Sequence, residues 1–577
     1  MNNNRLLIGK EYPNWNIVVG TKASKVEINA ANELQHFLHE VLGVIFPIIT
    51  DNQDSKNHEI IVGCNNRIEK LGLTIPWQEL GDEGFIIKTY KENLIIVGGK
   101  LRGTLYGVYT FLEDYAGCRW FSSTVSRIPK KEYLDLYGID DKQIPALEYR
   151  ETFYFDAFDG DWAARNKSNG HFAKLEEKHG GKIKYSHFVH TFNSLVPVEE
   201  YFDSHPEYFS EINGKRISKR TQLCLTNPDV LKIAINRVRE WIEEEPDVKI
   251  ISISQNDWYN PCECKNCRII DEKEGSHSGT LIHFVNKIAE VIEKDYPDKF
   301  IDTLAYQYTR KPPKYVRPRK NVIVRLCSIE CCFSHPLETC REVCYRFVDK
   351  VEPGSSFAKD LEGWAKICDR LYVWDYVTNF SHYLLPFPNF HVLQPNIKYL
   401  INNNVVGIFE EGNYEIGGGG EFAELRAYVI AKLLWNPDYD VNLAINEFLT
   451  GYYGMAAPAI REYFDMIHKK VIDENIHLSI YDPPINEYLT PDIIEKANKL
   501  FDRAEMLADN AEILERVKIA RLPIKFVNLA VMEKDVPEKE KLIDEFFEEI
   551  KQYGITRIKE GRDLEFSKRM MLSREYY

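Results

Sequence analysis

Residues 251–258 read Ile251-Ser252-Ile253-Ser254-Gln255-Asn256-Asp257-Trp258, with apolar residues at alternate positions followed by two amides, an acid and an aromatic ring. This alternation is typical of a β-strand. In (β/α)8 barrels, the residues that bind and convert the substrate lie at the carboxyl ends of the strands. The stretch therefore predicts one strand of such a barrel, with Asp257 at the catalytic rim.

The same kind of pattern recurs along the chain from about Tyr149, where short apolar segments alternate with helical ones. Such alternation is the signature of parallel β/α units. The candidate strands are 149–155, 187–192, 221–226, 248–256, 300–307, 321–329, 371–377 and 404–410. Because eight strands make a TIM barrel, we predict an α/β fold in which residues 145–420 form a (β/α)8 TIM barrel.

Two further regions flank the predicted barrel. Residues 1–140 contain several apolar strand patterns and an amphipathic helical pattern over residues 30–42, which predicts a small α/β domain. Residues 421–577 have the pattern of a helical C-terminal region. A single core stops growing at about 250–300 residues, so a chain of this length is expected to divide into domains.

Carboxylates also close the seventh and eighth predicted strands, which end in Trp374-Asp375-Tyr376 and in Glu410-Glu411. Two carboxylates flanking a bond are the usual equipment for glycoside hydrolysis. Neighbouring strand residues point to opposite faces, so only one of Glu410 and Glu411 is expected to face the cavity. Asp257 alone could equally cap the turn that follows its strand. The convergence of three strand ends favours the catalytic interpretation.

Three further residues near the first two strand ends are candidates for substrate binding: Arg150, His187 and His190. A histidine in such a place is more often a packed or hydrogen-bonded residue than a catalyst.

A cysteine-rich loop follows Asp257, with Cys262, Cys264 and Cys267, and His277 lies further along the chain. Thiolates at this spacing could bind zinc, but a structural zinc site usually draws on two separated pairs of ligands. We therefore expect the loop to hold no metal, and no motif in the sequence predicts a cofactor.

The composition limits the possible partners. The formal net charge of −15 disfavours binding to nucleic acid or to an anionic membrane surface. The N-terminus has no apolar run of the secretory kind, and no later stretch is apolar enough to cross a bilayer. The expectation is a cytoplasmic protein with an oligosaccharide or glycan as its partner.

Several motifs resemble those of the proteins grouped as domain of unknown function 4838, which is associated with glycoside hydrolase family 163, endo-β-N-acetylglucosaminidases acting on N-glycans. These motifs lie at residues 187–192, 205–209, 222–227, 254–257 with 262–264, and 420–426. The N-terminal region, through residues 30–34 and 101–109, resembles the small domain that precedes the barrel in α-glucuronidases and β-hexosaminidases.

The resemblance implies hydrolysis of β-linked N-acetylglucosamine, in which the 2-acetamido group of the substrate attacks the anomeric carbon. Such substrate-assisted enzymes need a proton donor and a carboxylate that orients the acetamide. We assign these tasks to Asp257 and Glu410, with Glu411 as the substitute. Asn256 is expected near the C2 substituent and Asp375 at the sugar hydroxyls. The walls of the sugar site are expected to be Trp258, Trp374 and Tyr376.

Two other functions stay open at this point. An α-glucuronidase would need a cation for the uronate carboxylate, with Arg150 or Arg325 as the available candidates. A non-catalytic carbohydrate-binding protein would keep the aromatic residues but would not need Asp257 or Glu410.

Overall fold

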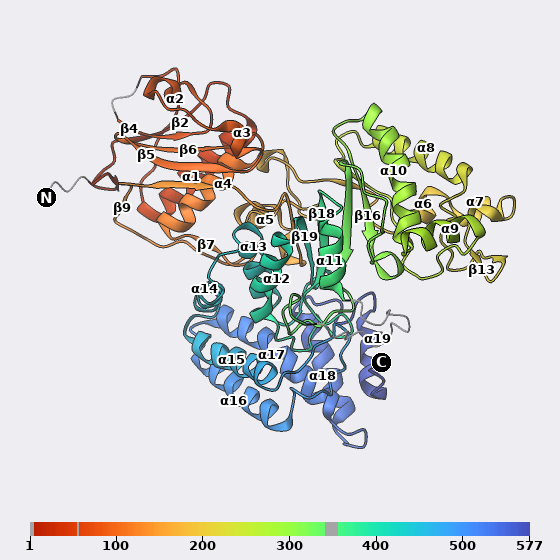
Figure 1. The fold of residues 1–577 in the computed structure, drawn as a ribbon. Helices are drawn as coiled ribbons and strands as arrows, with labels where there is room; N and C mark the ends of the chain where they lie inside the picture. Colours follow the sequence, from red (N-terminus) through yellow and green to blue (C-terminus); the bar gives the residue numbers. More distant parts are fainter. Residues whose placement is uncertain (1–4, 55–56, 341–355, 577) are drawn as a thin grey trace.

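The computed structural model describes residues 5–54, 57–340 and 356–576. The protein is a mixed α/β molecule with an N-terminal sheet domain, a central curled parallel sheet and a helical C-terminal region (Figure 1). No helix in these three ranges combines the length and the hydropathy needed to cross a membrane.

The N-terminal domain is built on a mixed sheet. Helices α1 (Lys25–Leu42) and α4 (Gly103–Phe111) contribute many residues to the hydrophobic core that they share with this sheet. Helix α1 begins at Ser24, which forms a capping box with Glu27, and it ends at Gly43 in the left-handed conformation (φ 69°). The strands, in spatial order, are β10 (Asp140–Gln143), β5 (Phe85–Tyr90), β6 (Asn93–Gly98), β4 (His58–Val62), β2 (Trp15–Val19) and β3 (Ile48–Thr50).

The central sheet has seven strands, and every neighbouring pair is parallel. It curls so far that Tyr149 and Tyr185, on its two edge strands, have their ring centroids 5.8 Å apart. The strands, in spatial order, are β11 (Tyr149–Phe153), β19 (Val405–Glu411), β18 (Leu371–Tyr376), β17 (Val322–Cys327), β16 (Phe300–Ala305), β15 (Ile250–Ser252) and β12 (Tyr185–Ser186).

This sheet is not the closed eight-stranded barrel that the sequence predicts, because residues 221–226 form no strand of it. Within the described part of the chain, their only β-bridge is an isolated one between Leu223 and Phe209. The segment is held by side chains instead: the Gln222 amide donates hydrogen bonds to the backbone oxygens of Asn256 (2.9 Å) and Trp258 (2.6 Å). Strand β12 takes the place beside β15 that this segment would otherwise fill.

The gap between the edge strands β11 and β12 is filled by an irregular segment. The Asn169 backbone links both sides, donating to the Arg150 carbonyl (3.2 Å) and accepting from the Ile183 amide (2.9 Å). The second strand is also shorter than expected and lies earlier than 187–192, because His187 (φ 51°) and His190 (φ 56°) take the left-handed conformation, which no strand accommodates.

Inside the curl, Arg325 lies fully buried among aromatic rings and opposite Asp302, with 3.4 Å between Nε and Oδ2. The rings within about 6 Å of its guanidinium carbon are those of Tyr149, Tyr185, Phe188, Tyr372, Trp374 and Phe409. Gly407 belongs to the same interior, where a Cβ would come within 2.6 Å of the Tyr372 ring. The interior is therefore packed solid below the carboxyl ends of the strands.

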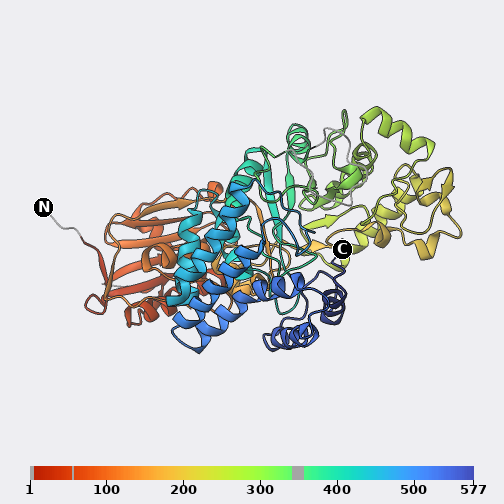
Figure 2. The ribbon, with the colours of Figure 1, turned by 90° about the horizontal axis from the view of Figure 1, so that it is seen from below.

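The C-terminal region consists of helices that lie beneath the junction of the two sheets (Figures 1 and 2). Helix α13 ties the parts together: Lys432 binds Glu113 of the N-terminal domain, and the Trp435 ring lies parallel to that of Phe85 at 5.8 Å. The helices are α13 (Ala423–Trp435), α14 (Val441–Tyr453), α15 (Ala457–Asp473), α16 (Pro491–Leu507), α17 (Ala511–Val531), α18 (Lys539–Gln552) and α19 (Leu564–Ser573).

Candidate active site

Strand β19 sets the position of one carboxylate at the carboxyl end of the central sheet. Phe409 packs in the sheet interior, and Glu411, two residues on, shares its face. The Trp374 indole on the neighbouring strand donates a hydrogen bond to Glu411 Oε2 (2.7 Å). Glu411 is therefore the carboxylate that strand eight presents inside the curl.

Asp257 approaches the same place from the loop after β15. Its side chain is exposed, and its Oδ1 accepts a hydrogen bond from the hydroxyl of Tyr306 (3.0 Å) at the end of β16. The negative charge of Asp257 also raises the pKa of Glu411, as a minor contribution beside burial. Asp257 and Glu411 therefore influence each other electrostatically at the carboxyl end of the sheet, where the sequence predicts that carboxylates converge.

A third carboxylate, Glu560, comes from the C-terminal region, and the sequence analysis missed it. Its Oε1 accepts a hydrogen bond from the Tyr414 hydroxyl (3.2 Å), just beyond β19. Glu560 lies in a turn between two helices, where no periodicity marks it as functional. We call Asp257, Glu411 and Glu560 the acidic mouth.

Glu411 and Glu560 both have raised pKa values. Burial raises the pKa of Glu411 well above its ordinary value, and the negative charge of Glu560 adds to this, while the Trp374 hydrogen bond opposes it. Burial likewise raises the pKa of Glu560, against the hydrogen bond from Tyr414. The raised pKa favours the protonated form of Glu411, which is the form that a general acid needs.

Aromatic side chains adjoin these carboxylates. Trp374 and Tyr376 lie on the inner face of β18, with their rings stacked at 6.3 Å, and the charge of Glu411 raises the pKa of Tyr376 in addition to burial. Trp374 is partly exposed, whereas Tyr376 is buried. Both predicted sugar-wall residues of this strand thus lie beside Glu411.

Glu410 and Asp375, which the sequence analysis placed in the catalytic and binding sets, face the other way. They pair across β19 and β18 on the outer face of the sheet, under the helical layer, and both are buried. Ser328 donates a hydrogen bond to Asp375 Oδ1 (2.5 Å), and Glu410 Oε2 has no hydrogen-bond partner among the residues that the structure describes. Because strand alternation fixes this orientation, Glu410 is separated from the acidic mouth by the sheet itself.

Asn256 and Trp258 serve as anchors of the loop that carries Asp257. The Asn256 amide and the Trp258 indole both donate to the Thr221 carbonyl, at 3.0 and 2.8 Å. Asn256 also accepts from the Asn193 amide (3.2 Å). The Asn256 amide that was expected near the C2 substituent is therefore engaged within the protein, and the Trp258 ring that was expected as a sugar wall is held by its indole N–H.

Arg150 and His187 lie away from the acidic mouth. Arg150 forms a buried ion pair with Glu83 of the N-terminal domain (2.7 Å), and His187 stacks on Trp241 at 3.8 Å. His190 is nearer: its Nδ1 is hydrogen-bonded to the Gln255 carbonyl (2.8 Å), and its ring lies 6.2 Å from that of Tyr306. Of the three, only His190 keeps a position compatible with substrate binding.

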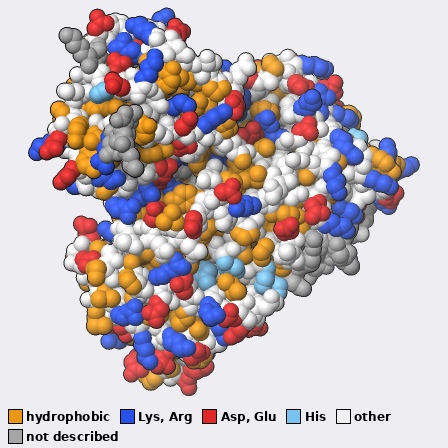
Figure 3. Space-filling view, turned by 60° about the vertical axis from the view of Figure 1, so that its left-hand side comes forward, with side chains coloured by type: hydrophobic (Ala, Val, Ile, Leu, Met, Phe, Trp, Pro, Cys, Tyr) orange, Lys and Arg blue, Asp and Glu red, His pale blue; other side chains and the backbone are white. Residues whose placement is uncertain are grey.

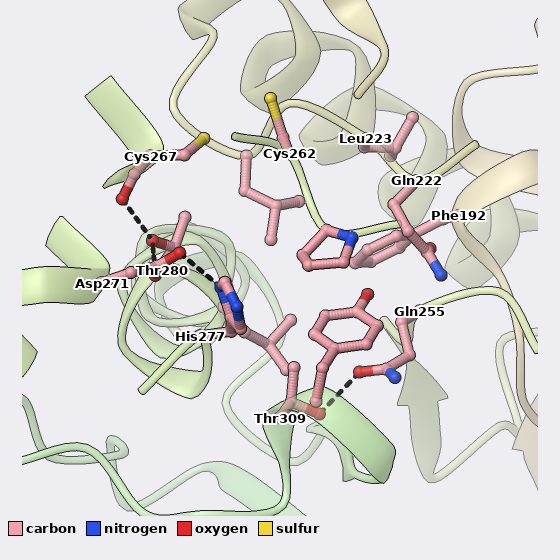
Figure 4. Close-up of a pocket in the computed structure, with 14 residues that line it drawn as sticks. Phe192, Gln222, Leu223, Gln255, Cys262, Cys267, Asp271, His277, Thr280 and Thr309 are labelled. Carbon is pink, nitrogen blue, oxygen red and sulfur yellow. Dashed lines mark hydrogen bonds and ion pairs between the residues drawn. The ribbon is translucent and has the colours of Figure 1, made fainter. Parts of the chain in front are cut away.

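Figure 4 shows a hollow between the ends of the strands and helices α9 (Lys265–Glu274) and α10 (Ser278–Asp295). None of the three carboxylates of the acidic mouth is among its described lining residues. Its one carboxylate, Asp271, is bonded to His277 and Thr280. The rest of its lining is mainly apolar, and this hollow lacks the paired acids that glycoside hydrolysis needs. In the described chain, the side-chain groups with metal-ligand spacing are two cysteine-containing clusters, neither of which includes the acidic mouth.

On the face drawn in Figure 3, acidic and basic side chains are interspersed rather than gathered by sign. This distribution offers no single-sign surface of the kind that binds a polyelectrolyte.

Two family profiles match the chain. The profile described as domain of unknown function DUF4838 matches residues 120–465, and the profile of the glycosyl hydrolase family 67 N-terminus matches residues 5–111. None of the curated proteins matches.

Among solved structures, the chain is similar to a family GH115 4-O-methyl-α-glucuronidase with specificity for decorated arabinogalactans, with a TM-score of 0.58 and 14% identity over 95% of this chain and 76% of that one. It is also similar to a family 89 glycoside hydrolase from Clostridium perfringens, with a TM-score of 0.49 and 11% identity over 91% of this chain and 65% of that one. The first likeness shows a fold of the glycoside hydrolase kind.

Proposed function

The chain belongs to the DUF4838 family, and we propose that it is a glycoside hydrolase that cleaves β-linked N-acetylglucosamine in oligosaccharides or N-glycans. The observation that carries the proposal is the meeting of Asp257, Glu411 and Glu560 with Trp374 and Tyr376 at the carboxyl end of the central sheet. Paired carboxyl groups with different environments are what glycosidic bond cleavage requires.

In this proposal Glu411 is the proton donor. Its raised pKa favours the protonated carboxyl group, which can donate a proton to the oxygen of the leaving sugar. The acetamido carbonyl oxygen of the substrate attacks the anomeric carbon as the glycosidic bond breaks. Asp257, held by the Tyr306 hydroxyl, accepts the acetamide N–H and so orients the attacking oxygen. Water then opens the cyclised intermediate, and Glu411, now ionised, accepts its proton.

The charge of the acidic mouth favours a neutral sugar. The charges that act most strongly on Glu411 are those of Glu560 and Asp257, both negative. A uronate would bring another negative charge beside them, whereas N-acetylglucosamine brings none.

An α-glucuronidase is the second candidate. The family 67 N-terminal profile and the GH115 neighbour favour it. Lys559, whose charge acts on Glu560, is the cation that would pair with a uronate. Arg150 is engaged with Glu83, and Arg325 is fully buried below the strand ends, so neither candidate from the sequence serves this purpose.

A substrate panel separates the candidates. The purified protein is assayed on aryl β-N-acetylglucosaminide, aryl α-glucuronide and released N-glycans. We expect turnover of the first or third substrate and none of the second. Turnover of the glucuronide alone would establish the second candidate, and binding without turnover of any of the three would indicate a non-catalytic carbohydrate-binding protein.

The assisted mechanism has its own test. Fluorine atoms on the acetamide methyl group withdraw electrons from the carbonyl oxygen, so each added fluorine should slow hydrolysis. A thiazoline that mimics the cyclised intermediate should inhibit strongly, because the site is complementary to states beyond the substrate. A rate that does not change across the fluorinated series would show that hydrolysis proceeds without the acetamide.

A further inference from the structure

We propose that Cys224, Cys262, Cys264 and Cys267 form a structural zinc site with four thiolate ligands. From the sequence, this loop is expected to hold no metal, because it offers only three closely spaced cysteines. The structure adds a fourth, Cys224, from the segment that replaces the expected third strand.

The distances between the sulfur atoms fit zinc. All four sulfurs lie within 4.8 Å of one another, and Cys224 Sγ is 3.7 Å from Cys264 Sγ and 3.9 Å from Cys267 Sγ. With Zn–S bonds of ~2.3 Å, the edge of a tetrahedron is ~3.8 Å. A disulfide would need ~2.05 Å between two sulfurs, and these cysteines are all free. The group therefore has the dimensions of a tetrahedral thiolate site.

The surroundings of the cluster suit thiolates better than thiols. All four side chains are buried, between 2% and 7% exposed. The Glu211 backbone amide (3.4 Å) and the Arg216 guanidinium (3.5 Å) donate hydrogen bonds to Cys262 Sγ. Metal-bound ligands are commonly held by such outer donors, which also offset the negative charge of a site with four thiolates.

The local fold brings the ligands together from two separated segments, with Cys224 from one segment and the other three cysteines from the second. Cys264 is the N-cap of helix α9 and Cys267 lies in its first turn, so this pair straddles a helix start. Cys224 reaches the pair from a segment distant in sequence. The sequence pattern alone did not show that this fourth ligand is near.

The proposed zinc site is connected to the acidic mouth through the chain segments that carry its ligands. The 221–226 segment that carries Cys224 also carries Gln222, which binds the backbone at Asn256 and Trp258 on both sides of Asp257. Cys262 lies on the same loop after Asp257. A metal here would clamp the loop that holds Asp257 where a strand of the sheet is missing.

A second group of donors, Cys332, His335, Cys340 and His477, also lies within 4.8 Å, but its members are less buried except for Cys332. A metal count on the whole protein would not distinguish the two groups. The proposal is therefore tested by difference, with variants of the four-cysteine cluster alone.

The experiment is zinc analysis by mass spectrometry on protein purified in metal-free buffer after growth with zinc. Cys224→Ser combined with Cys267→Ser should lower the zinc content by one equivalent per chain relative to the unchanged protein. The matched control, Cys118→Ser with Cys368→Ser, changes two buried cysteines outside the cluster and should retain that equivalent.

A second measurement, on protein in which Cys332→Ser and Cys340→Ser remove the thiols of the other donor group, applies even if the cluster variant does not fold. A mercurial reagent that titrates thiols should release zinc, with a fall in melting temperature, and cobalt loaded in its place should show the charge-transfer absorption of thiolate ligands. Cobalt bands without thiolate character, or protein that takes up neither metal, would overturn the proposal. Both measurements are independent of hydrolysis, so they stand apart from the proposed function.

Discussion

At the scale of single residues, the carboxyl groups of the acidic mouth have different surroundings. Glu411 is buried and bonded to Trp374, whereas Asp257 is exposed and bonded to Tyr306. Two carboxyl groups whose surroundings differ in this way can take the acid role and the orienting role in one reaction.

Asp257→Asn should remove most hydrolysis while leaving sugar binding largely intact. A positioned acid or base contributes ~10²–10⁴-fold, and the amide keeps the shape of the carboxylate. The measurement is kcat and Kd on the substrate that the panel identifies. Asp203→Asn, on an exposed loop, is the control that should leave both unchanged. Near-normal kcat in Asp257→Asn would remove this residue from the mechanism.

Two substitutions should shift the pH profile of kcat/KM in opposite directions. The charge of Glu560 raises the pKa of Glu411, so Glu560→Gln should lower that pKa and move the alkaline limb of kcat/KM to lower pH. The Trp374 hydrogen bond lowers the pKa of Glu411, so Trp374→Phe should move the same limb to higher pH. Profiles that shift in the same direction, or not at all, would show that Glu411 does not set this limb.

The sequence analysis assigned the catalytic role on strand eight to Glu410, with Glu411 as the substitute, whereas the structure places Glu411 inside the curl. Alternation says that the two differ, yet the absolute orientation depends on which neighbours fill the interior, here Phe409 and Trp374. Glu560 was beyond prediction, because its approach depends on the packing of the C-terminal helices.

At the scale of elements, six of the eight predicted strand ranges coincide with strands of the parallel sheet. The second strand lies just before its predicted range, and the third predicted strand is missing. Residues 221–226 have a suitable apolar pattern, but Gln222 and Cys224 are used in side-chain contacts instead of a ladder. The local sequence pattern cannot show such long-range partners. The prediction of a closed eight-stranded barrel was wrong for this reason.

The interior of the sheet depends on the Arg325 and Asp302 pair. Arg325→Met should lower the free energy of unfolding by about 3–5 kcal/mol, because it leaves Asp302 buried without its cation. Burial already raises the pKa of Asp302 to about 6, from a model-compound value of 3.8. Loss of Arg325 raises it further.

The pH dependence supplies the check on this pair. A carboxyl group with a raised folded pKa contributes stability at low pH that is lost as pH rises through that pKa. The free energy of unfolding of Arg325→Met, measured with denaturant, should therefore fall more steeply above about pH 6 than that of the unchanged protein. Adding Asp302→Asn should recover part of the loss, and a purely additive double variant would contradict the pairing.

At the scale of the whole molecule, buried ion pairs join the N-terminal domain to the rest. Glu113 binds Lys432 of helix α13 and lies 3.5 Å from Lys167 of the central region. Burial works against the charged form, but these cations outweigh it and lower the pKa of Glu113 to about 2, from 4.5.

Glu113→Gln should destabilise the protein by about 3 kcal/mol at neutral pH, the free energy of a shift of this size. A depressed folded pKa gives stability that is present above the unfolded pKa and lost as pH falls through the folded one. The difference in free energy of unfolding between the unchanged protein and Glu113→Gln should thus narrow as pH falls from 4.5 to about 2. Denaturant unfolding across this range is the measurement, and a constant difference would contradict the assignment.

The central claim is that Glu411, and not its neighbour Glu410, donates the proton in glycoside hydrolysis. The most direct test is the initial rate on aryl β-N-acetylglucosaminide for the unchanged protein, Glu411→Gln and Glu410→Gln. The account predicts turnover by the unchanged protein, a loss of ~10²–10⁴-fold in Glu411→Gln, and a rate within a few-fold of normal in Glu410→Gln. A dead Glu410→Gln beside an active Glu411→Gln, or no turnover by the unchanged protein, would contradict it.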